Sequence, residues 1–136
     1  MRDPYADRHI AFNRLYKEYQ THKKLIVAID FDDTVFDFHK EGHTYDRVFD
    51  VLFECQNLGF YIVLFTGTPK EKWPEQIKYL DQFGIHVDSV NTNPLPLPFG
   101  NDGKIYYNIL LDDRAGLGES LSILELVITE IYRENL

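Results

Sequence analysis

The chain has 136 residues, of which 44% are hydrophobic, 15% aromatic and 26% charged. This length and composition predict one globular domain with a core of its own and exclude a disordered chain. Fourteen basic residues against 22 acidic ones give a formal net charge of −8 at pH 7. A charge of that sign works against bulk binding to nucleic acid or to an anionic membrane.

No segment of the sequence predicts targeting or a membrane span. The N-terminal stretch MRDPYADRHIAF has no apolar region of the kind that signal peptides carry, and no apolar run approaches the length of a span. The single cysteine, Cys55, rules out an internal disulfide, and its helical spacing from Val48 and Leu52 predicts a place in the core. We therefore expect a soluble, cytoplasmic protein.

The first half of the chain alternates between helical and strand-like patterns. Apolar side chains at helical spacing predict an amphipathic helix over about 8–21, and the apolar run 24–29 predicts a strand covered on both faces. A second helix, ending near Gly59, is predicted by the stripe of Tyr45, Val48, Phe49 and Leu52. The run FYIVLF, 60–65, predicts the second strand.

The second half repeats the alternation. A third helix, with Pro74 in its first turn, is predicted by the stripe of Trp73, Ile77 and Leu80. A weaker strand follows over 85–91, and then the loop TNPLPLPFGNDG, 92–103, whose prolines favour a stiffened connection over a polyproline ligand. A fourth strand is predicted over 106–111, and a last helix by Leu121, Leu124, Ile128 and Ile131.

Strands that alternate with helices predict an α/β fold. We expect one domain over 1–136, a three-layer α/β/α sandwich around a central parallel, Rossmann-like sheet. Ligands of such sheets bind outside the carboxyl ends of the strands. The candidate functional residues are therefore those that directly follow the apolar runs: Asp30, Asp32, Asp33, Thr66, Asp112 and Asp113.

The residue types at these strand ends favour phosphoryl transfer. Asp30 and Asp32 are two apart and can project into one cleft, which Asp112 could join from another strand. Three carboxylates this close raise one another's pKa unless a cation is bound, and Mg²⁺ is the usual hard cation where phosphate is also bound. Helix N-termini and the hydroxyl of Thr66 could supply donors to anionic oxygens. A metal, an anion cradle and a spare carboxylate are typical of phosphoryl-transfer sites.

Three segments resemble the motifs of a known family. IVAIDFDDTVF, 26–36, resembles the first motif of the haloacid-dehalogenase-like superfamily, an apolar strand followed by D-x-D-x-T. FYIVLFTGT, 60–68, resembles the second, and NILLDDRAG, 108–116, resembles the fourth, which ends in paired aspartates. The three occur in the family's order and span most of the chain.

The resemblance implies a Mg²⁺-dependent phosphatase, a phosphoric monoester hydrolase that works through an aspartyl-phosphate. Asp30 would be the nucleophile and Asp32 the general acid/base, and an acid at that second position resembles the phosphatases of the family rather than its dehalogenases or transport ATPases. Thr66 and Gly67 would bind the transferring phosphoryl group. Asp33 replaces the commoner glycine, and we expect it to shape the turn.

The metal set implied by the same resemblance draws on both strand ends. Mg²⁺ would be held by the carboxylates of Asp30 and Asp112 and by the backbone carbonyl of Asp32. Asp113 would be either a ligand or a partner of one.

The third motif of the family is a lysine, and its assignment stays open. Lys104 has the expected order in the chain, but a fully extended strand would place it ~20 Å from Asp112 at ~3.3 Å per residue. Either the strand starts later and Lys104 lies in a loop that doubles back, or Lys70 or Lys72 serves instead. Arg114 could clamp a substrate anion, although an ion pair with Asp113 or Glu119 is an equal alternative.

The segments that could gate the site are short. About ten residues separate Thr34 from the second helix, room for a flap over about 35–43 but not for a cap domain, and 92–103 is also too short. An open site suits a macromolecular or exposed phosphate, whereas small phosphomonoesters would need cover from a neighbouring subunit of a homo-oligomer. His39 and His43 are expected as solvated flap residues rather than metal ligands.

Two other classes of function stay open. The chain could be a relative of this family that binds or assembles without turnover. It could also be a receiver-type signalling domain, but that family carries its phospho-accepting aspartate after the third strand, where this sequence has Ser89–Asn93.

Overall fold

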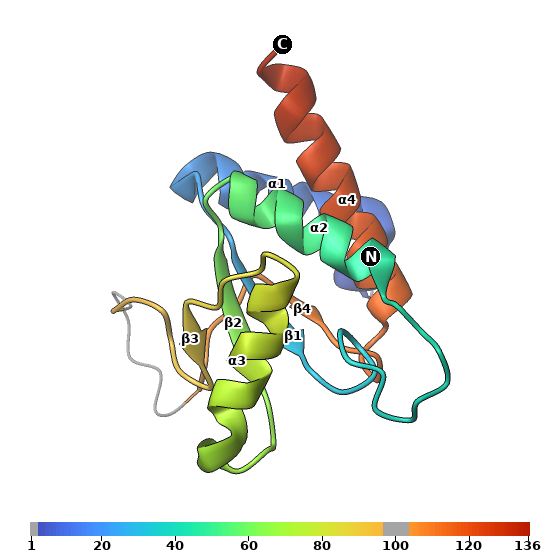
Figure 1. Cartoon of the computed structure of the whole chain (residues 1–136). Helices are drawn as coiled ribbons and strands as arrows, with labels where there is room; N and C mark the ends of the chain where they lie inside the picture. The colour runs from blue at the N-terminus through green and yellow to red at the C-terminus, as the bar shows by residue number, and fades with distance from the viewer. Residues whose placement is uncertain (1–2, 97–103) are drawn as a thin grey trace.

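The computed structural model describes residues 3–96 and 104–136, so residues 97–103 of the predicted loop lie outside the described part. The helical elements are η1 (Pro4–Ala6), α1 (Arg8–His22), α2 (Asp46–Asn57), η2 (Lys70–Lys72), α3 (Trp73–Gln82) and α4 (Leu117–Glu134). The strands are β1 (Ile26–Asp30), β2 (Tyr61–Phe65), β3 (Ser89–Val90) and β4 (Ile109–Leu111). Figure 1 shows the strands side by side with the helices around them, and α4 projecting beyond the rest at the C-terminus.

The strands form one parallel sheet in the order β3-β2-β1-β4. The chain builds outward from β1 to β3 and then returns to place β4 on the other side of β1. The strand order therefore reverses between β1 and β4, and ligands of open α/β sheets bind at the carboxyl side of such a reversal. Ile29 pairs with Leu64 on one side and Leu111 on the other, so the residues after β1 and β4 leave the sheet next to each other.

The core lies between the helices and one face of the sheet. That face carries Val27, Ile29, Ile62, Leu64, Ile109 and Leu111. All four α-helices contribute buried side chains to the same cluster, among them Leu15, Leu52, Leu80 and Leu124. Cys55 is fully buried within it, as predicted, and burial raises the pKa of its thiol to about 12. The α/β class and the parallel sheet are thus confirmed, and residues 3–96 and 104–136 contain no cap domain.

Both outer strands are shorter than predicted, because polar side chains replace part of the ladder. The predicted strand 106–111 begins only at Ile109, since the side chain of Asn108 accepts from the backbone N–H of Ile26 at 2.6 Å. The predicted strand 85–91 contracts to Ser89–Val90, where the carboxylate of Asp88 accepts from the N–H of Ile62 at 2.7 Å. Each of these side chains ties the entry of an outer strand to its inner neighbour.

The ends of α2 follow from local backbone conformation. Gly59, the predicted terminator, has φ +78°, in the left-handed region that glycine adopts without strain. At the other end Tyr45 has φ +57°, and the helix begins at Asp46 directly after it. Within residues 3–96 and 104–136, no helix combines the length and the apolar character that crossing a membrane requires.

Candidate functional site

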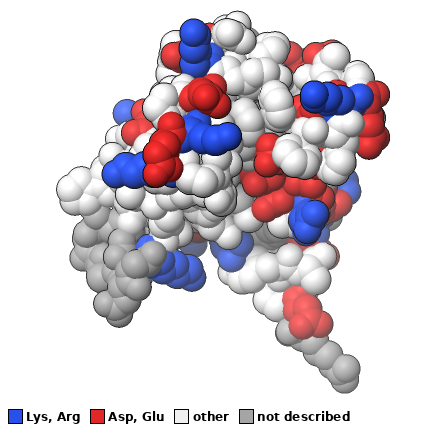
Figure 2. Space-filling view, turned by 60° about the horizontal axis from the view of Figure 1, so that its bottom comes forward, with Lys and Arg blue, Asp and Glu red and all other residues white. Residues whose placement is uncertain are grey.

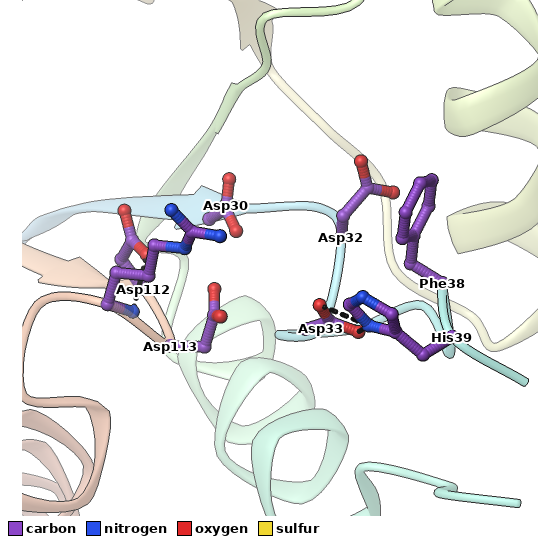
Figure 3. Close-up of a pocket in the computed structure, with 8 residues that line it drawn as sticks. Asp30, Asp32, Asp33, Phe38, His39, Asp112 and Asp113 are labelled. Atoms are coloured by element: carbon purple, nitrogen blue, oxygen red, sulfur yellow. Dashed lines mark hydrogen bonds and ion pairs between the residues drawn. The ribbon is translucent and has the colours of Figure 1, made fainter. Parts of the chain in front are cut away.

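A cavity of about 320 Å³ opens at the carboxyl edge of the sheet, where the strand order reverses. Eight residues line it: Asp30, Asp32, Asp33, Phe38, His39, Asp112, Asp113 and Arg114. They come from the end of β1, the loop that follows it and the loop after β4 (Figure 3). Figure 2 shows a group of acidic side chains on the face seen when the bottom of Figure 1 is turned forward. The cavity joins two segments that are about eighty residues apart in the sequence.

Three of the carboxylates can hold a metal ion together. Asp30, Asp112 and Asp113 each offer an oxygen, and these oxygens lie within 4.8 Å of one another. In an octahedral Mg²⁺ site with ligands at about 2.1 Å, two ligand oxygens are roughly 3–4 Å apart, so only a small contraction is needed. Hard carboxylate oxygens are also the donor type that Mg²⁺ prefers. The Asp32 carboxylate is not in this group, and a role for its backbone carbonyl stays a prediction.

Burial and neighbouring charges raise the proton affinity of Asp30 and Asp32. The pKa of Asp30 rises to about 7, first because the group is partly buried, then because Asp113 hydrogen-bonds to it and the charges of Asp112 and Asp113 lie close. The pKa of Asp32 is also raised, mainly by burial and then by the charge of Asp33. Without a cation, Asp30 therefore keeps its proton in part of the molecules at neutral pH, where an isolated aspartate would have lost it.

Thr34 is the residue that the sequence reasoning left without a role. Its side chain is fully buried, and its Oγ1 lies 3.3 Å from Oδ2 of Asp30 and 3.2 Å from Oδ1 of Asp113. The same oxygen accepts the backbone N–H of Asp113 at 3.0 Å. A hydroxyl has one hydrogen to donate, so it serves one of the two carboxylates at a time. Thr34 thus ties the end of β1 to the loop after β4, and the threonine of D-x-D-x-T was the signal that could have found it.

Asp33 shapes the turn after β1, as predicted, and does more. Its φ is +61°, in the left-handed region, and its N–H donates to the carbonyl of Phe36 at 2.8 Å. Its carboxylate lies 3.0 Å from Nδ1 of His39, an interaction that Figure 3 marks. This contact holds the flap against the turn, which brings His39 to the rim of the cavity. His43 is exposed, lies 3.4 Å from Glu41 and does not line the cavity.

Thr66 and Gly67 directly follow β2, and neither lines the cavity. The side chain of Asn91 holds this segment by accepting the N–H of Thr66 at 2.9 Å and donating to its carbonyl at 2.8 Å. The hydroxyl of Thr66 accepts the N–H of Thr68 at 3.2 Å, so its own hydrogen can still be donated. Asn91 was not singled out in the sequence, because a lone asparagine after a weak strand carries no distinctive pattern.

The positive charge at the cavity comes from an arginine and not from a predicted lysine. Lys104, Lys70 and Lys72 are exposed, and none of them lines the cavity. The ammonium of Lys70 lies over the ring of Trp73, 5.9 Å from its centroid. The later start of β4 leaves Lys104 five residues before the strand. The structure thus brings none of the three lysines to the cavity wall.

Arg114 lines the cavity, and its backbone N–H donates to Oδ1 of Asp112 at 2.9 Å. Its alternative partner, Glu119, is instead paired with Arg8, whose guanidinium makes two hydrogen bonds to that carboxylate. Within the described part of the chain, no ion pair joins the Arg114 guanidinium to a carboxylate. The guanidinium is therefore available to an anion in the cavity.

The comparisons with known proteins give a fold but no family. No protein-family model matches the chain, and neither does any curated protein. Among solved structures the chain is similar to one from Bacteroides thetaiotaomicron that is described only as a conserved protein, with a TM-score of 0.59 and 18% sequence identity. The likeness covers 82% of this chain and 92% of that one. It supports the α/β fold of the whole domain and says nothing of its chemistry.

Proposed function

We propose that the protein is a capless, Mg²⁺-dependent phosphatase of the haloacid-dehalogenase-like type that hydrolyses phosphomonoesters. The proposal is carried by the grouping of Asp30, Asp112 and Asp113, whose oxygens lie within 4.8 Å of one another at the point where the strand order reverses. The resemblance of 26–36, 60–68 and 108–116 to three motifs of that superfamily adds to it. A cytoplasmic location stays a prediction of the sequence.

The donor set fits the metal that this chemistry needs. Asp30, Asp112 and Asp113 would hold Mg²⁺, which would neutralise charge on the carboxylates and on the phosphoryl oxygens. A bound cation would lower the pKa of the Asp30 carboxyl from its value of about 7, so that this side chain would be ionised at neutral pH and could act as a nucleophile.

The remaining steps use the chain's own side chains. An Asp30 oxygen attacks phosphorus, and the bond from phosphorus to the ester oxygen breaks as that oxygen takes the proton of Asp32. Asp32 then removes a proton from water, whose oxygen attacks the phosphorus of the aspartyl-phosphate. Phosphate leaves and both aspartates are restored. The raised pKa of Asp32 favours the protonated form that the first step requires.

Two further side chains support these steps. Thr34 orients the carboxylates of Asp30 and Asp113 through its buried hydroxyl, so it is a positioning residue. Arg114 supplies the positively charged side chain that is a lysine in the family, because it lines the cavity and its guanidinium is available. Thr66 would contact the phosphoryl group only by donating the free hydrogen of its hydroxyl.

The receiver alternative is weaker for a structural reason, and a binding protein without turnover is distinguished by experiment. A receiver domain carries its acceptor aspartate after the third strand, whereas β3 is followed here by Asn91 and the cavity carboxylates follow β1 and β4. A binding protein without turnover would be favoured if the protein bound Mg²⁺ but hydrolysed no phosphate ester.

The test is hydrolysis of p-nitrophenyl phosphate by the purified protein with and without Mg²⁺. We expect turnover that requires Mg²⁺ and is abolished in Asp30→Asn, whose amide cannot form the acyl phosphate. Asp50→Asn, an exposed aspartate on α2, is the matched control and should keep full activity. Activity that survives Asp30→Asn would contradict the mechanism.

A further inference from the structure

The flap places one aromatic ring at the wall of an otherwise polar cavity. Of the eight lining residues, five are aspartates, one is Arg114 and one is His39. The eighth is Phe38, whose side chain is 56% exposed. Figure 3 shows Phe38 beside Asp32, at the end of the cavity away from Asp112. We infer that Phe38 is a stacking surface for the leaving group, and that the site takes phosphate monoesters whose leaving group carries a planar aromatic ring. This inference rests on the proposed function.

The flap that carries Phe38 is held by backbone hydrogen bonds, and the ring itself contacts His39. Its backbone N–H donates to the carbonyl of Phe36 at 2.9 Å. The carboxylate of Asp37 accepts the N–H groups of Glu41 and Gly42 at 3.1 and 2.8 Å, which closes the flap into a compact loop. The ring also meets the edge of His39, with 5.2 Å between ring centroids and 87° between planes.

The base of the flap is anchored to the core. The ring of Phe36 stacks on Phe31 with centroids 5.3 Å apart and meets Tyr79 of α3 edge-on at 5.1 Å. His39 in turn is tied to Asp33, 3.0 Å away. A ring that is already ordered loses little conformational entropy when a ligand stacks on it, so its exposed area is available for binding.

The position of Phe38 matches the leaving group rather than the phosphate. In the proposed reaction Asp32 gives its proton to the ester oxygen, so the leaving group lies on the Asp32 side of the cavity. Phe38 is the apolar lining residue on that side. A planar ring can stack on it, and such contacts between aromatic rings contribute beyond the apolar area that they bury.

The charges at the cavity limit the rest of the leaving group. Five carboxylates face one guanidinium and one imidazole, so the wall stays acidic after one divalent cation has bound. A second phosphate on the leaving group would be repelled. The expected substrates are therefore monophosphates with a neutral aromatic group, the ring being that of an aryl group or of a nucleobase.

A pair of esters that differ only in the ring tests the inference. Benzyl phosphate and cyclohexylmethyl phosphate have the same type of ester oxygen and similar size, but only the first carries an aromatic ring. We expect kcat/KM to favour the benzyl ester about three- to tenfold, in line with the usual strength of aromatic contacts. Phe38→Ala should remove this preference and Phe38→Trp should keep it. Phe53→Ala, which alters a ring of 48% exposure on α2 outside the cavity, should leave it unchanged.

A second pair identifies the source of the ring. If the base of a nucleotide reaches Phe38, the variant Phe38→Ala will lower kcat/KM for adenosine 5′-monophosphate and leave ribose 5-phosphate unchanged. Either effect of Phe38→Ala, loss of the benzyl preference or a lower kcat/KM for adenosine 5′-monophosphate alone, supports the inference. The pair in which the effect is seen shows whether the ring is an aryl group or a nucleobase. No loss in both pairs overturns it while leaving the proposed phosphatase intact.

A binding measurement separates the inference from the proposed function. In Asp30→Asn with Mg²⁺, the ring protons of benzyl phosphate should show an upfield ring-current shift, and benzyl phosphate should bind more tightly than its cyclohexyl analogue. Both effects should vanish in the double variant with Phe38→Ala. If the wild-type protein hydrolyses neither p-nitrophenyl phosphate nor any of the four esters, the proposed function fails. The dissociation constants still decide whether Phe38 recognises a ring, and equal constants for the two esters would refute it.

Discussion

Replacing Asp30 by asparagine should make the metal-free protein more stable at pH 8 while abolishing activity. In the folded protein the pKa of Asp30 is raised from its ordinary value of 3.8 to about 7, with burial as the largest cause. The folded state therefore binds this proton more tightly than the unfolded state does. Stability is highest below the unfolded pKa and falls as the pH rises toward 7, because an increasingly charged carboxylate is then held beside Asp112 and Asp113.

The size of this effect follows from the shift. A pKa of about 7 against 3.8 corresponds to at most about 4 kcal/mol. Asp30 is only partly buried, so solvent screening reduces the expected destabilisation at pH 8 to about 1–2 kcal/mol. Asp30→Asn removes the charge and keeps an oxygen that can accept from the hydroxyl of Thr34, which lies 3.3 Å away in the wild type.

Urea unfolding of both proteins at pH 4.5 and pH 8, with EDTA, measures the effect. The free energy of unfolding of Asp30→Asn minus that of the wild type should rise by about 1–2 kcal/mol between the two pH values. Adding Mg²⁺ at pH 8 should stabilise the wild type more than the variant, because only the wild type has the full carboxylate set. A difference that does not change with pH, or a variant that Mg²⁺ stabilises equally, would refute the account of this site.

Two further substitutions test the parts around Asp30. Thr34→Val keeps the shape of a fully buried side chain but removes the hydroxyl, so we expect about 1–3 kcal/mol of lost stability in urea unfolding and a lower kcat. An unchanged kcat would show that Thr34 does not position the carboxylates. Arg114→Ala should raise KM for a phosphate ester severalfold, whereas Lys104→Ala should not, because only Arg114 lines the cavity. If Lys104→Ala raised KM and Arg114→Ala did not, Lys104 would be the active-site lysine that the family resemblance implies.

The framework of the site follows from the pattern of the sequence. Apolar runs of strand length, separated by helical stripes, require a parallel sheet, and the residues after such runs leave at one edge. For this reason the sequence pattern alone places Asp30 and Asp112 together. The register of Ile29 with Leu111 confirms this placement, because it aligns the ends of β1 and β4.

Which side chains meet beyond the strand ends depends on the folded structure. The direction of a side chain there depends on the turn that follows, and the left-handed conformation of Asp33 turns the chain so that Thr34 points inward to Asp113. The group of carboxylates therefore includes that of Asp113 and excludes that of Asp32. The spacing of the aspartates in the sequence does not predict this selection.

The same reason explains the cation and the flap. The late start of β4 depends on the hydrogen bond from Ile26 to the side chain of Asn108, a contact between residues 82 positions apart. Local sequence patterns do not predict such a contact. The order of Lys104 in the chain therefore agrees with the family motif, but its position relative to the cavity does not follow from the sequence. The ring of Phe38 belonged to a segment with no periodicity, and only the contacts of Asp37 and His39 fix it at the wall of the cavity. Periodicity and strand direction therefore predict the sheet and the residues at its carboxyl edge. Hydrogen bonds between distant residues, which those patterns do not predict, position the side chains around the cavity.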